Sequence, residues 1–174
     1  MNIDQTGLQT AIAKARKGGK EGGCPIGASL IYHDGDEVYV LGAAHNENTQ
    51  KHPNIPHAET ASIQDAGSQK LETFQKTTLY TTLSPCSMCT GAILYFGIPC
   101  VVIGEDIHAE GRVNIELLRR RGVEVVLHEN EECKELLQKF IDENPKVRQL
   151  NDKPELYPRL LEREQSQVWF NRPP

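Results

Sequence analysis

The feature that most restricts how this chain can fold is a pair of short motifs that have to meet in space. The first is His57-Ala58-Glu59, and the second, further along the chain, is Pro85-Cys86-Ser87-Met88-Cys89. A structural zinc has four protein ligands, commonly imidazoles and thiolates, whereas a catalytic zinc has three and keeps one position for water. The sequence therefore predicts an open Zn²⁺ site formed by His57, Cys86 and Cys89.

Both motifs suit the first turn of a helix. Residues three apart lie on one helix face, so Cys86 and Cys89 reach a single ion if Pro85 opens a helix there. The positive end of that helix should also lower the thiol pKa values. Glu59 would then lie beside the metal-activated water rather than on the metal, where its carboxylate can carry a proton to a substrate nitrogen.

His-x-Glu followed by Pro-Cys-x-x-Cys is the signature of zinc-dependent nucleobase deaminases. The chain resembles the cytosine deaminases of the fungal type from about Gly7 to Pro145. The matching segments are Lys20-Glu21-Gly22-Gly23-Cys24-Pro25-Ile26-Gly27, His45-Asn46, residues 77–86, residues 88–93 and Gly97-Ile98-Pro99. The resemblance implies hydrolysis of a free nucleobase, with cytosine to uracil plus ammonia as the leading reaction, by a zinc-dependent homodimer.

The same resemblance implies which residues contact a small heterocyclic substrate. Asn46 matches the family's substrate-binding asparagine, although an Asn after a strand can also cap a turn. Ser84 matches a residue whose main-chain carbonyl meets the amino group. Trp169 and Phe170 could form an aromatic lid over the base, or they could pack the tail onto the core. His108 falls where the family has a pocket wall, and a surface position is its alternative. The full set of candidate substrate-binding residues is Asn46, Ala58, Ser84, His108, Trp169, Phe170 and Arg172.

Two positions depart from the fungal pattern and bear on the substrate. Alanine at Ala58 stands where fungal enzymes carry glycine, and is common in tRNA adenosine and guanine deaminases. Asn171 and Arg172 stand where the family has an acidic residue after Trp169-Phe170. One hypothesis is that Arg172 meets a hydrogen-bond acceptor on the substrate.

Other functions stay open at this point. Within the enzyme class, the alternatives are deamination of guanine, isocytosine or a creatinine-like heterocycle, and deamination of adenosine in tRNA. Outside it, a non-catalytic zinc-binding protein would need a fourth ligand such as Cys24, His45 or His52, and would leave Glu59 idle.

Composition limits the partners and the compartment. The net charge of −5 makes nucleic acid an unfavourable partner, because binding a polyanion depends on neutralising phosphates. No apolar run is long enough for a membrane span, and the N-terminus lacks the basic and apolar stretches of a signal peptide. Five cysteines, an odd number, favour reduced thiols over a disulfide framework. We therefore expect a cytoplasmic protein.

Hydrophobic periodicity and turn residues predict the order of the elements. Helices are expected at 4–17, 57–66, 86–95, 114–121 and 131–144, and strands at 28–32, 38–43, 77–82, 100–103 and 124–127. An antiparallel hairpin followed by alternating strands and helices indicates an α/β protein. The predicted fold is a three-layer α/β/α sandwich with a central five-stranded mixed sheet, as in cytidine-deaminase-like proteins. We expect a deaminase domain at 1–145 and, at 146–174, a C-terminal extension packed on or near the active site.

Overall fold

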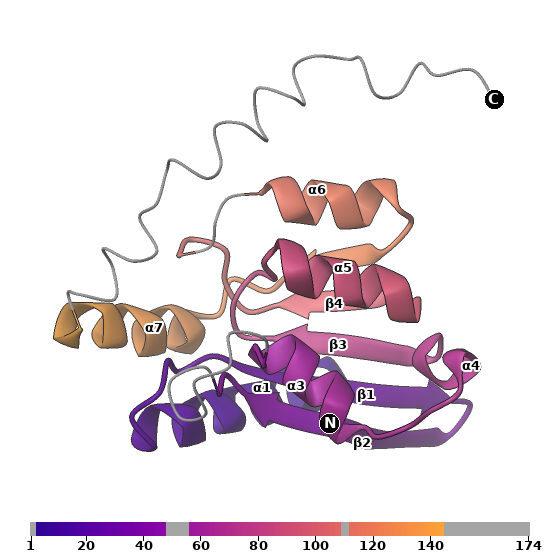
Figure 1. Cartoon of the computed structure of the whole chain (residues 1–174), viewed down its shortest axis with the longest axis horizontal. Coiled ribbons are helices and arrows are strands. Elements are labelled where there is room, and N and C mark those ends of the chain that lie inside the picture. Colours follow the sequence, from indigo (N-terminus) through magenta and orange to yellow (C-terminus); the bar gives the residue numbers. More distant parts are fainter. Residues whose placement is uncertain (1–2, 48–55, 109–111, 145–174) are drawn as a thin grey trace, which may run out of the picture. The chain divides into compact units, whose positions relative to one another are not determined.

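The computed structural model describes residues 3–47, 56–108 and 112–144. Figure 1 shows the arrangement of the elements within this part of the chain. In chain order they are α1 (Ile3–Lys20), β1 (Gly27–Asp34), β2 (Glu37–His45), α3 (Ala58–Asp65), α4 (Leu71–Phe74), β3 (Thr77–Thr81), α5 (Ser87–Phe96), β4 (Cys100–Ile103), α6 (Val113–Arg120), β5 (Glu124–Leu127) and α7 (Glu131–Glu143).

The five strands form one mixed sheet in the order β2-β1-β3-β4-β5. Strand β1 is antiparallel to both β2 and β3, and β3, β4 and β5 run parallel to one another. Parallel neighbours need a crossover connection, and α5 and α6 supply it. The carboxyl ends of β3 and β4 therefore meet the end of β2 and the start of β1 at one edge of the sheet, since Gly27 pairs with His45 and Ala28 with Thr81.

Two separate apolar clusters cover the two faces of the sheet, and they define the layers seen in Figure 1. On one face, Ala58, Ile93 and Leu118 bring α3, α5 and α6 against Leu79 and other strand residues. On the opposite face, α1 and α7 pack against β1, β3 and β4 through a second set of buried side chains. That set is Leu8, Ala11, Ile12, Ile31, Tyr80, Val102 and Cys133.

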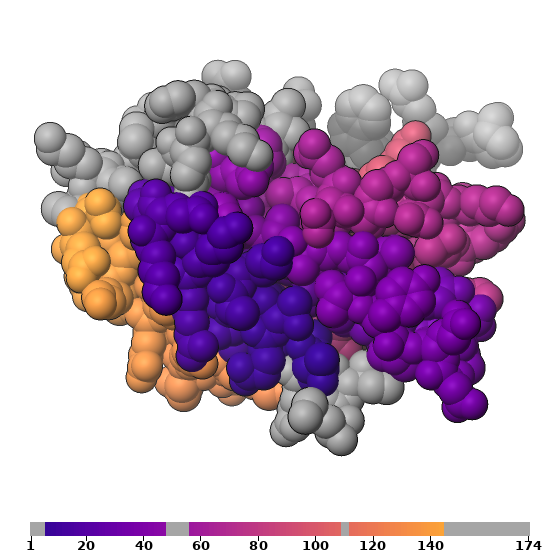
Figure 2. Space-filling model, turned by 90° about the horizontal axis from the view of Figure 1, so that it is seen from below, coloured from indigo at the N-terminus to yellow at the C-terminus, as the bar shows by residue number. Residues whose placement is uncertain are grey.

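Helices α1 and α7 lie next to each other on their face, as the indigo and orange surfaces in Figure 2 show, and Arg16 of α1 forms an ion pair with Glu132 of α7. Two glycines let the helices approach the sheet closely. A Cβ at Gly27 would overlap the main chain of α1 at Ala11, and one at Gly42 would overlap that of α3 at Ser62. The second approach fixes the height of α3 above the strands, and with it the position of the first motif.

The predicted fold class is confirmed: the chain is α/β, with a five-stranded mixed sheet between two helical layers. Each predicted helix and strand is present with ends that differ by a few residues, and the short helix α4 was not predicted. Within the described residues, the first compact unit ends at Phe140. The proposed extension at 146–174 lies outside the described residues. Among the described helices, none is both long and apolar enough to cross a membrane.

Candidate active site

The first motif lies at the start of α3. His57 is the N-cap residue, with extended backbone angles of φ −69° and ψ 160°. Its carbonyl oxygen accepts hydrogen bonds from the Ala61 amide at 2.8 Å and the Thr60 hydroxyl at 3.1 Å. The side chain of His57 makes no capping hydrogen bond. The main chain of His57 therefore caps the helix, and its imidazole is not used for capping.

The second motif lies at the start of α5, where Cys86 takes the same position. Cys86 is the N-cap, with φ −70° and ψ 173°, and its carbonyl accepts from the Thr90 amide at 2.8 Å. The prediction that Pro85 is the first helical residue is wrong, because α5 begins at Ser87. Cys89 lies in the first turn and is fully buried. The pair still converges, because one thiol comes from the cap and the other from the turn above it.

The two helix starts bring three metal-binding atoms together. The ligand atoms of His57, Cys86 and Cys89 all lie within 4.8 Å of one another. The His57 Nδ1 atom is 3.4 Å from the Cys86 Sγ atom. Tetrahedral zinc, with bonds near 2.0 Å to nitrogen and 2.3 Å to sulfur, places such atoms roughly 3.6 Å apart. The residues therefore fit Zn²⁺ in identity and in spacing.

The thiols of this cluster differ in acidity. The pKa of Cys86 is lowered to about 4, mainly by the hydrogen bond from the Cys89 thiol and also by His57, against an opposing effect of burial. The pKa of Cys89 is raised, because its thiol donates to Cys86, is buried, and faces Glu59. The prediction that the helix end lowers both pKa values concerns the thiolates that bind zinc, and it stays a prediction. The two sulfurs thus share one proton through their hydrogen bond, and binding of a metal to both would release it.

Glu59 lies against the cluster but outside the set of donors. It is 4% exposed, in the first turn of α3. Its Oε2 atom accepts from the Cys89 thiol at 3.4 Å, and its Oε1 atom lies 3.2 Å from the Thr81 hydroxyl. Burial is the main cause that raises the pKa of this carboxyl group. A carboxyl group in this position can hold and pass on a proton, as general acid-base chemistry requires.

Two of the predicted substrate residues lie at the sheet edge that carries the cluster. Asn46 follows β2 and is 7% exposed, and its amide donates to the Ile26 carbonyl at 2.8 Å. The Glu47 amide donates to the Pro56 carbonyl at 3.1 Å, which ties this segment to the start of α3. Ser84 is 5% exposed, and within the described residues its hydroxyl oxygen has no hydrogen-bond partner. An unsatisfied buried hydroxyl beside the cluster fits contact with a polar ligand.

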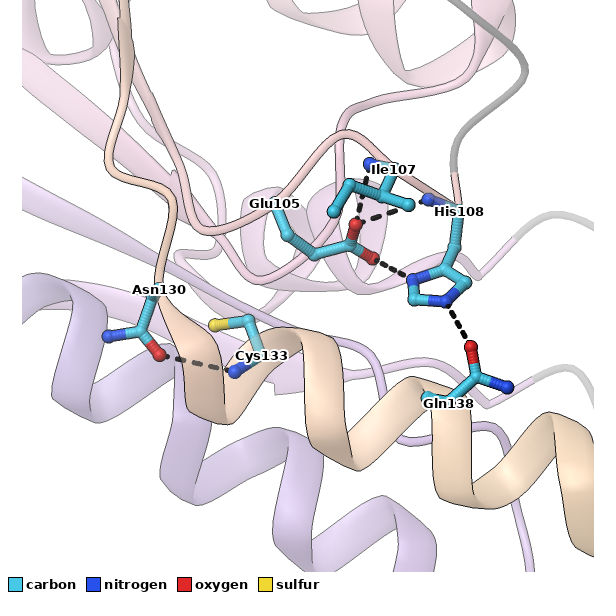
Figure 3. Close-up of polar contacts among 6 residues, drawn as sticks. All are labelled: Glu105, Ile107, His108, Asn130, Cys133 and Gln138. Carbon is cyan, nitrogen blue, oxygen red and sulfur yellow. Dashed lines mark hydrogen bonds and ion pairs between the residues drawn. The ribbon is translucent and has the colours of Figure 1, made fainter.

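Two other predicted residues have side chains engaged within the protein. The methyl group of Ala58 is fully buried in the core cluster below α3. Both ring nitrogens of His108 have partners: Nδ1 is 3.1 Å from the Glu105 carboxylate and Nε2 is 2.9 Å from the Gln138 side-chain oxygen (Figure 3). A role of His108 in substrate binding stays a prediction, and its ring joins the loop after β4 to helix α7.

The remaining predicted residues are not part of the described structure. Trp169, Phe170 and Arg172 lie outside the described residues, as does His52. The other two suggested fourth ligands, Cys24 and His45, do not belong to the group of converging donors. Burial also raises the pKa of Cys24 to about 12, which makes it a poor source of thiolate.

Sequence reasoning missed two residues that support this edge. Thr81 contacts Glu59, and the carbonyl of Glu105 accepts from the Ser84 amide at 2.9 Å. The carboxylate of Glu105 is fully buried and also accepts from the amides of Ile107 at 2.7 Å and His108 at 3.2 Å (Figure 3). The available signal was positional: both residues lie at the carboxyl ends of parallel strands, where α/β proteins place functional groups.

A fold with this edge, and three zinc donors at two helix starts beside a buried carboxyl group, define a zinc-dependent deaminase. The chain belongs to the family described as the cytidine and deoxycytidylate deaminase zinc-binding region, whose model matches residues 1–105. It is 48% identical over 142 residues to the cytosine deaminase of Candida albicans, covering 82% of this chain and 91% of the relative. The resemblance to fungal-type cytosine deaminases is therefore confirmed.

More distant relatives have other substrates. The tRNA-specific adenosine deaminase of Bacillus subtilis is 35% identical over 108 residues, which cover 60% of this chain and 63% of that protein. A solved structure from a study of A-to-I editing by tRNA:A34 deaminases has a TM-score of 0.64 at 26% identity, covering 76% of this chain and 99% of that one. A guanine deaminase structure from Nitrosomonas europaea has a TM-score of 0.61 at 21% identity, covering 77% and 82%, and shows likeness of fold alone.

Proposed function

We propose that this protein is a zinc-dependent hydrolase that deaminates a free nucleobase, with cytosine to uracil plus ammonia as its reaction. The observation that carries the proposal is the convergence of His57, Cys86 and Cys89 with Glu59 buried beside them but outside the donor group. The choice of cytosine is supported by the cytosine deaminase of Candida albicans, which matches 82% of this chain at 48% identity.

The chemistry divides between the metal and Glu59. Zinc bound by the three donors supplies Lewis-acid activation of water near neutral pH. Glu59 takes the proton of the attacking water as the new carbon–oxygen bond forms at the amino-bearing carbon. Glu59 then gives that proton to the ring nitrogen. It next takes a second proton from the hydroxyl group newly attached to the carbon and gives it to the amine, so that the carbonyl forms, the carbon–nitrogen bond breaks and ammonia leaves. The raised pKa of Glu59 suits this role, because burial favours the protonated form that the cycle has to pass through.

Substrate orientation falls to polar groups at the same sheet edge. The Asn46 side-chain amide can donate to a ring carbonyl and accept from a ring N–H, as the edge of cytosine requires. Ser84 offers its main-chain carbonyl to the amino group that leaves, and its unsatisfied hydroxyl adds a second polar contact. Both residues are at least nine-tenths buried, so contacts made there are shielded from water.

The tail residues enter the proposal through the sequence alone. We propose that Trp169 and Phe170 cover the base, since stacking on a flat ring and exclusion of water both favour the reaction. Arg172 would meet a hydrogen-bond acceptor on the substrate. If Arg172→Ala leaves the preference between cytosine and carbonyl-rich analogues unchanged, this role of Arg172 is wrong.

A panel of free bases tests the proposed function directly. We expect the zinc-loaded protein to release ammonia from cytosine faster than from guanine, isocytosine or creatinine, and to leave adenosine in a tRNA anticodon stem-loop unchanged. Glu59→Gln, which keeps the size of the side chain but cannot accept the proton, is the control for contaminating activity. Faster release from guanine would reassign the substrate, and no release from any member would favour a non-catalytic zinc-binding protein.

We also propose a homodimer formed through α5 and α6, which lie side by side in Figure 1. Large apolar side chains are exposed on these helices, with Tyr95 81% exposed; the others are Met88, Val113 and Leu117. Light scattering should give twice the mass of one chain, and Tyr95→Arg should give one chain. The matched control is Tyr39→Arg, at an exposed tyrosine on β2 that should leave the dimer intact.

A cytoplasmic location is part of the proposal. All five cysteines lie within the described residues, and none forms a disulfide. Reduced thiols that serve as metal ligands are typical of a reducing compartment. A tagged full-length chain that fractionated with secreted proteins would contradict this location.

A further inference from the structure

The hydroxyl group of Thr81 connects the end of β3 to the catalytic carboxyl group. Thr81 is fully buried and lies on the same strand face as Leu79, which packs in the core cluster that also contains Ala58 of α3. Its Oγ1 atom is 3.2 Å from Glu59 Oε1 and 2.9 Å from the Leu83 carbonyl oxygen. Thr81, which lies three residues before Ser84, therefore contacts the carboxyl group of Glu59 that transfers the proton.

The two carboxyl oxygens of Glu59 have different surroundings. Oε1 faces the Thr81 hydroxyl, whereas Oε2 lies 3.4 Å from the Cys89 thiol, on the side of the zinc donors. Because the group is 4% exposed, water cannot replace Thr81 as a partner for Oε1. Without Thr81, rotation of the carboxyl group would bring Oε1 toward the donors as well.

We infer that Thr81 is a positioning residue for the reaction, which holds Glu59 Oε1 at the end of β3 and leaves Oε2 as the oxygen that exchanges protons with water and substrate. This inference rests on the proposed function of Glu59. It assigns the proton-transfer step to one oxygen, and gives the hydroxyl of Thr81 a task that its packing alone does not require.

A hydroxyl group suits this task better than other side chains of similar size. It has one proton to donate and lone pairs to accept. Thr81 can donate to Glu59 while that residue is ionised. When Oε2 carries the transferred proton, Oε1 is still a carbonyl oxygen, and Thr81 can go on donating to it. The contact with Glu59 thus persists on both sides of the proton transfer, so the carboxyl group does not have to reorient within the cycle.

The kinetic test compares Thr81→Val with Thr77→Val. Thr77 lies on the same face of β3, is 1% exposed, and donates its hydroxyl to the Phe74 carbonyl, so the two substitutions remove equivalent groups at opposite ends of one strand. We expect Thr81→Val to lower kcat for ammonia release by roughly 10- to 100-fold, the loss that corresponds to one hydrogen bond to an ionised group. KM should stay within about twofold. Thr81→Ser should restore most of kcat.

Several outcomes would overturn the inference. One is a kcat for Thr81→Val within twofold of that for Thr77→Val. Another is an equal loss in Thr81→Ser, which would indicate packing of the methyl group instead of the hydroxyl. If Thr81→Val does not fold, Thr81→Ala removes the same hydroxyl without adding a methyl group, and the same comparison applies.

A second measurement needs no turnover and separates this inference from the proposed function. In chelated protein, Thr81→Val and Glu59→Met should change the melting temperature non-additively, by roughly 2 °C or more, because the two side chains interact directly. Thr77→Val and Glu59→Met should add. Additivity for both pairs would overturn the inference, whereas coupling in a chain that releases no ammonia would mean that the proposed function alone had failed.

Discussion

Helices α3 and α5 start in the same way but differ in what their first turns contain. Each begins at an extended N-cap residue, His57 in α3 and Cys86 in α5, and neither cap uses its side chain to satisfy the helix. In the first turn, α3 places the carboxyl group of Glu59 and α5 places the thiol of Cys89, and both are buried. One helix therefore gives the metal a single ligand, and the other gives it two.

The difference shows how one geometry serves two purposes. Ser, Thr, Asp or Asn at an N-cap stabilises a helix by about 1 kcal/mol compared with residues that do not cap. At both starts this stabilisation is given up, because the side chain is needed for the metal. The helix that supplies only one ligand then has its first turn available for a carboxyl group that stays off the metal. Ligand number and proton transfer are thus divided between two similar helix starts.

Removing the thiol of α5 should have the largest effect. In Cys89→Ala only two protein donors remain, so we expect zinc in purified protein to fall well below one per chain and ammonia release to fall to background. Metal analysis beside the ammonia assay measures both. Cys100→Ala removes a half-buried cysteine outside the donor group and should retain zinc and turnover. Full zinc occupancy in Cys89→Ala would remove this thiol from the site.

Removing the carboxyl group of α3 should separate turnover from zinc content. Glu59→Ala leaves all three donors in place, so one zinc per chain should remain while kcat falls by roughly 10²- to 10⁴-fold, the usual contribution of a general acid-base group. The same two assays apply. Turnover close to wild type would show that the proton takes another route. Loss of zinc would show that Glu59, like Cys89, helps to hold the metal.

The metal site could be predicted from sequence because its information is local. Donor identity and spacing within His57-Ala58-Glu59 and Cys86-Ser87-Met88-Cys89 predict a zinc site and two helix starts. The three donors converge, and both helices start at these motifs. The strands were predictable for a similar reason, since alternation and turn residues are local signals. Pro85 was predicted as the first helical residue, but it precedes the N-cap residue Cys86. Proline suits the first helical residue, but it also suits the extended segment before a cap.

Contacts that depend on strand order could not be predicted. Thr81 meets Glu59 because the end of β3 comes close to the start of α3, which packs mainly on β2 and β1. That closeness follows from the order β2-β1-β3-β4-β5, which no single segment encodes. His108 was a candidate for substrate contact because it falls where the family places an aromatic wall over the pocket, with a surface position as the alternative. The sequence did not indicate the contacts of its ring nitrogens with Glu105 nearby and with Gln138 of α7, far along the chain. Long-range partners of polar side chains are what the sequence left open.

The smallest expected effect is on the stability of the folded chain, and it comes from Glu59 in the first turn of α3. Burial raises the pKa of Glu59 in the folded chain above its ordinary value of 4.5, so the folded state binds this proton more tightly than the unfolded chain does. Below that value both states are protonated and there is no penalty. As the pH rises, the unfolded chain ionises first, and the folded state loses stability relative to it. A glutamine cannot ionise and escapes this loss.

Chelated Glu59→Gln should therefore melt above chelated wild type at neutral pH, and the difference should shrink toward zero near pH 4. In a chain of this size each 1 kcal/mol corresponds to about 2–4 °C, so calorimetry at several pH values resolves the trend. Glu72→Gln, at an exposed glutamate in α4, is the control and should show no such trend. A difference in melting temperature that is constant with pH would mean that shape, not charge, separates glutamine from glutamate at position 59. Ionisation of the buried carboxyl group in α3 would then cost no stability, and in this respect Glu59 would not differ from the buried thiol of Cys89 in α5.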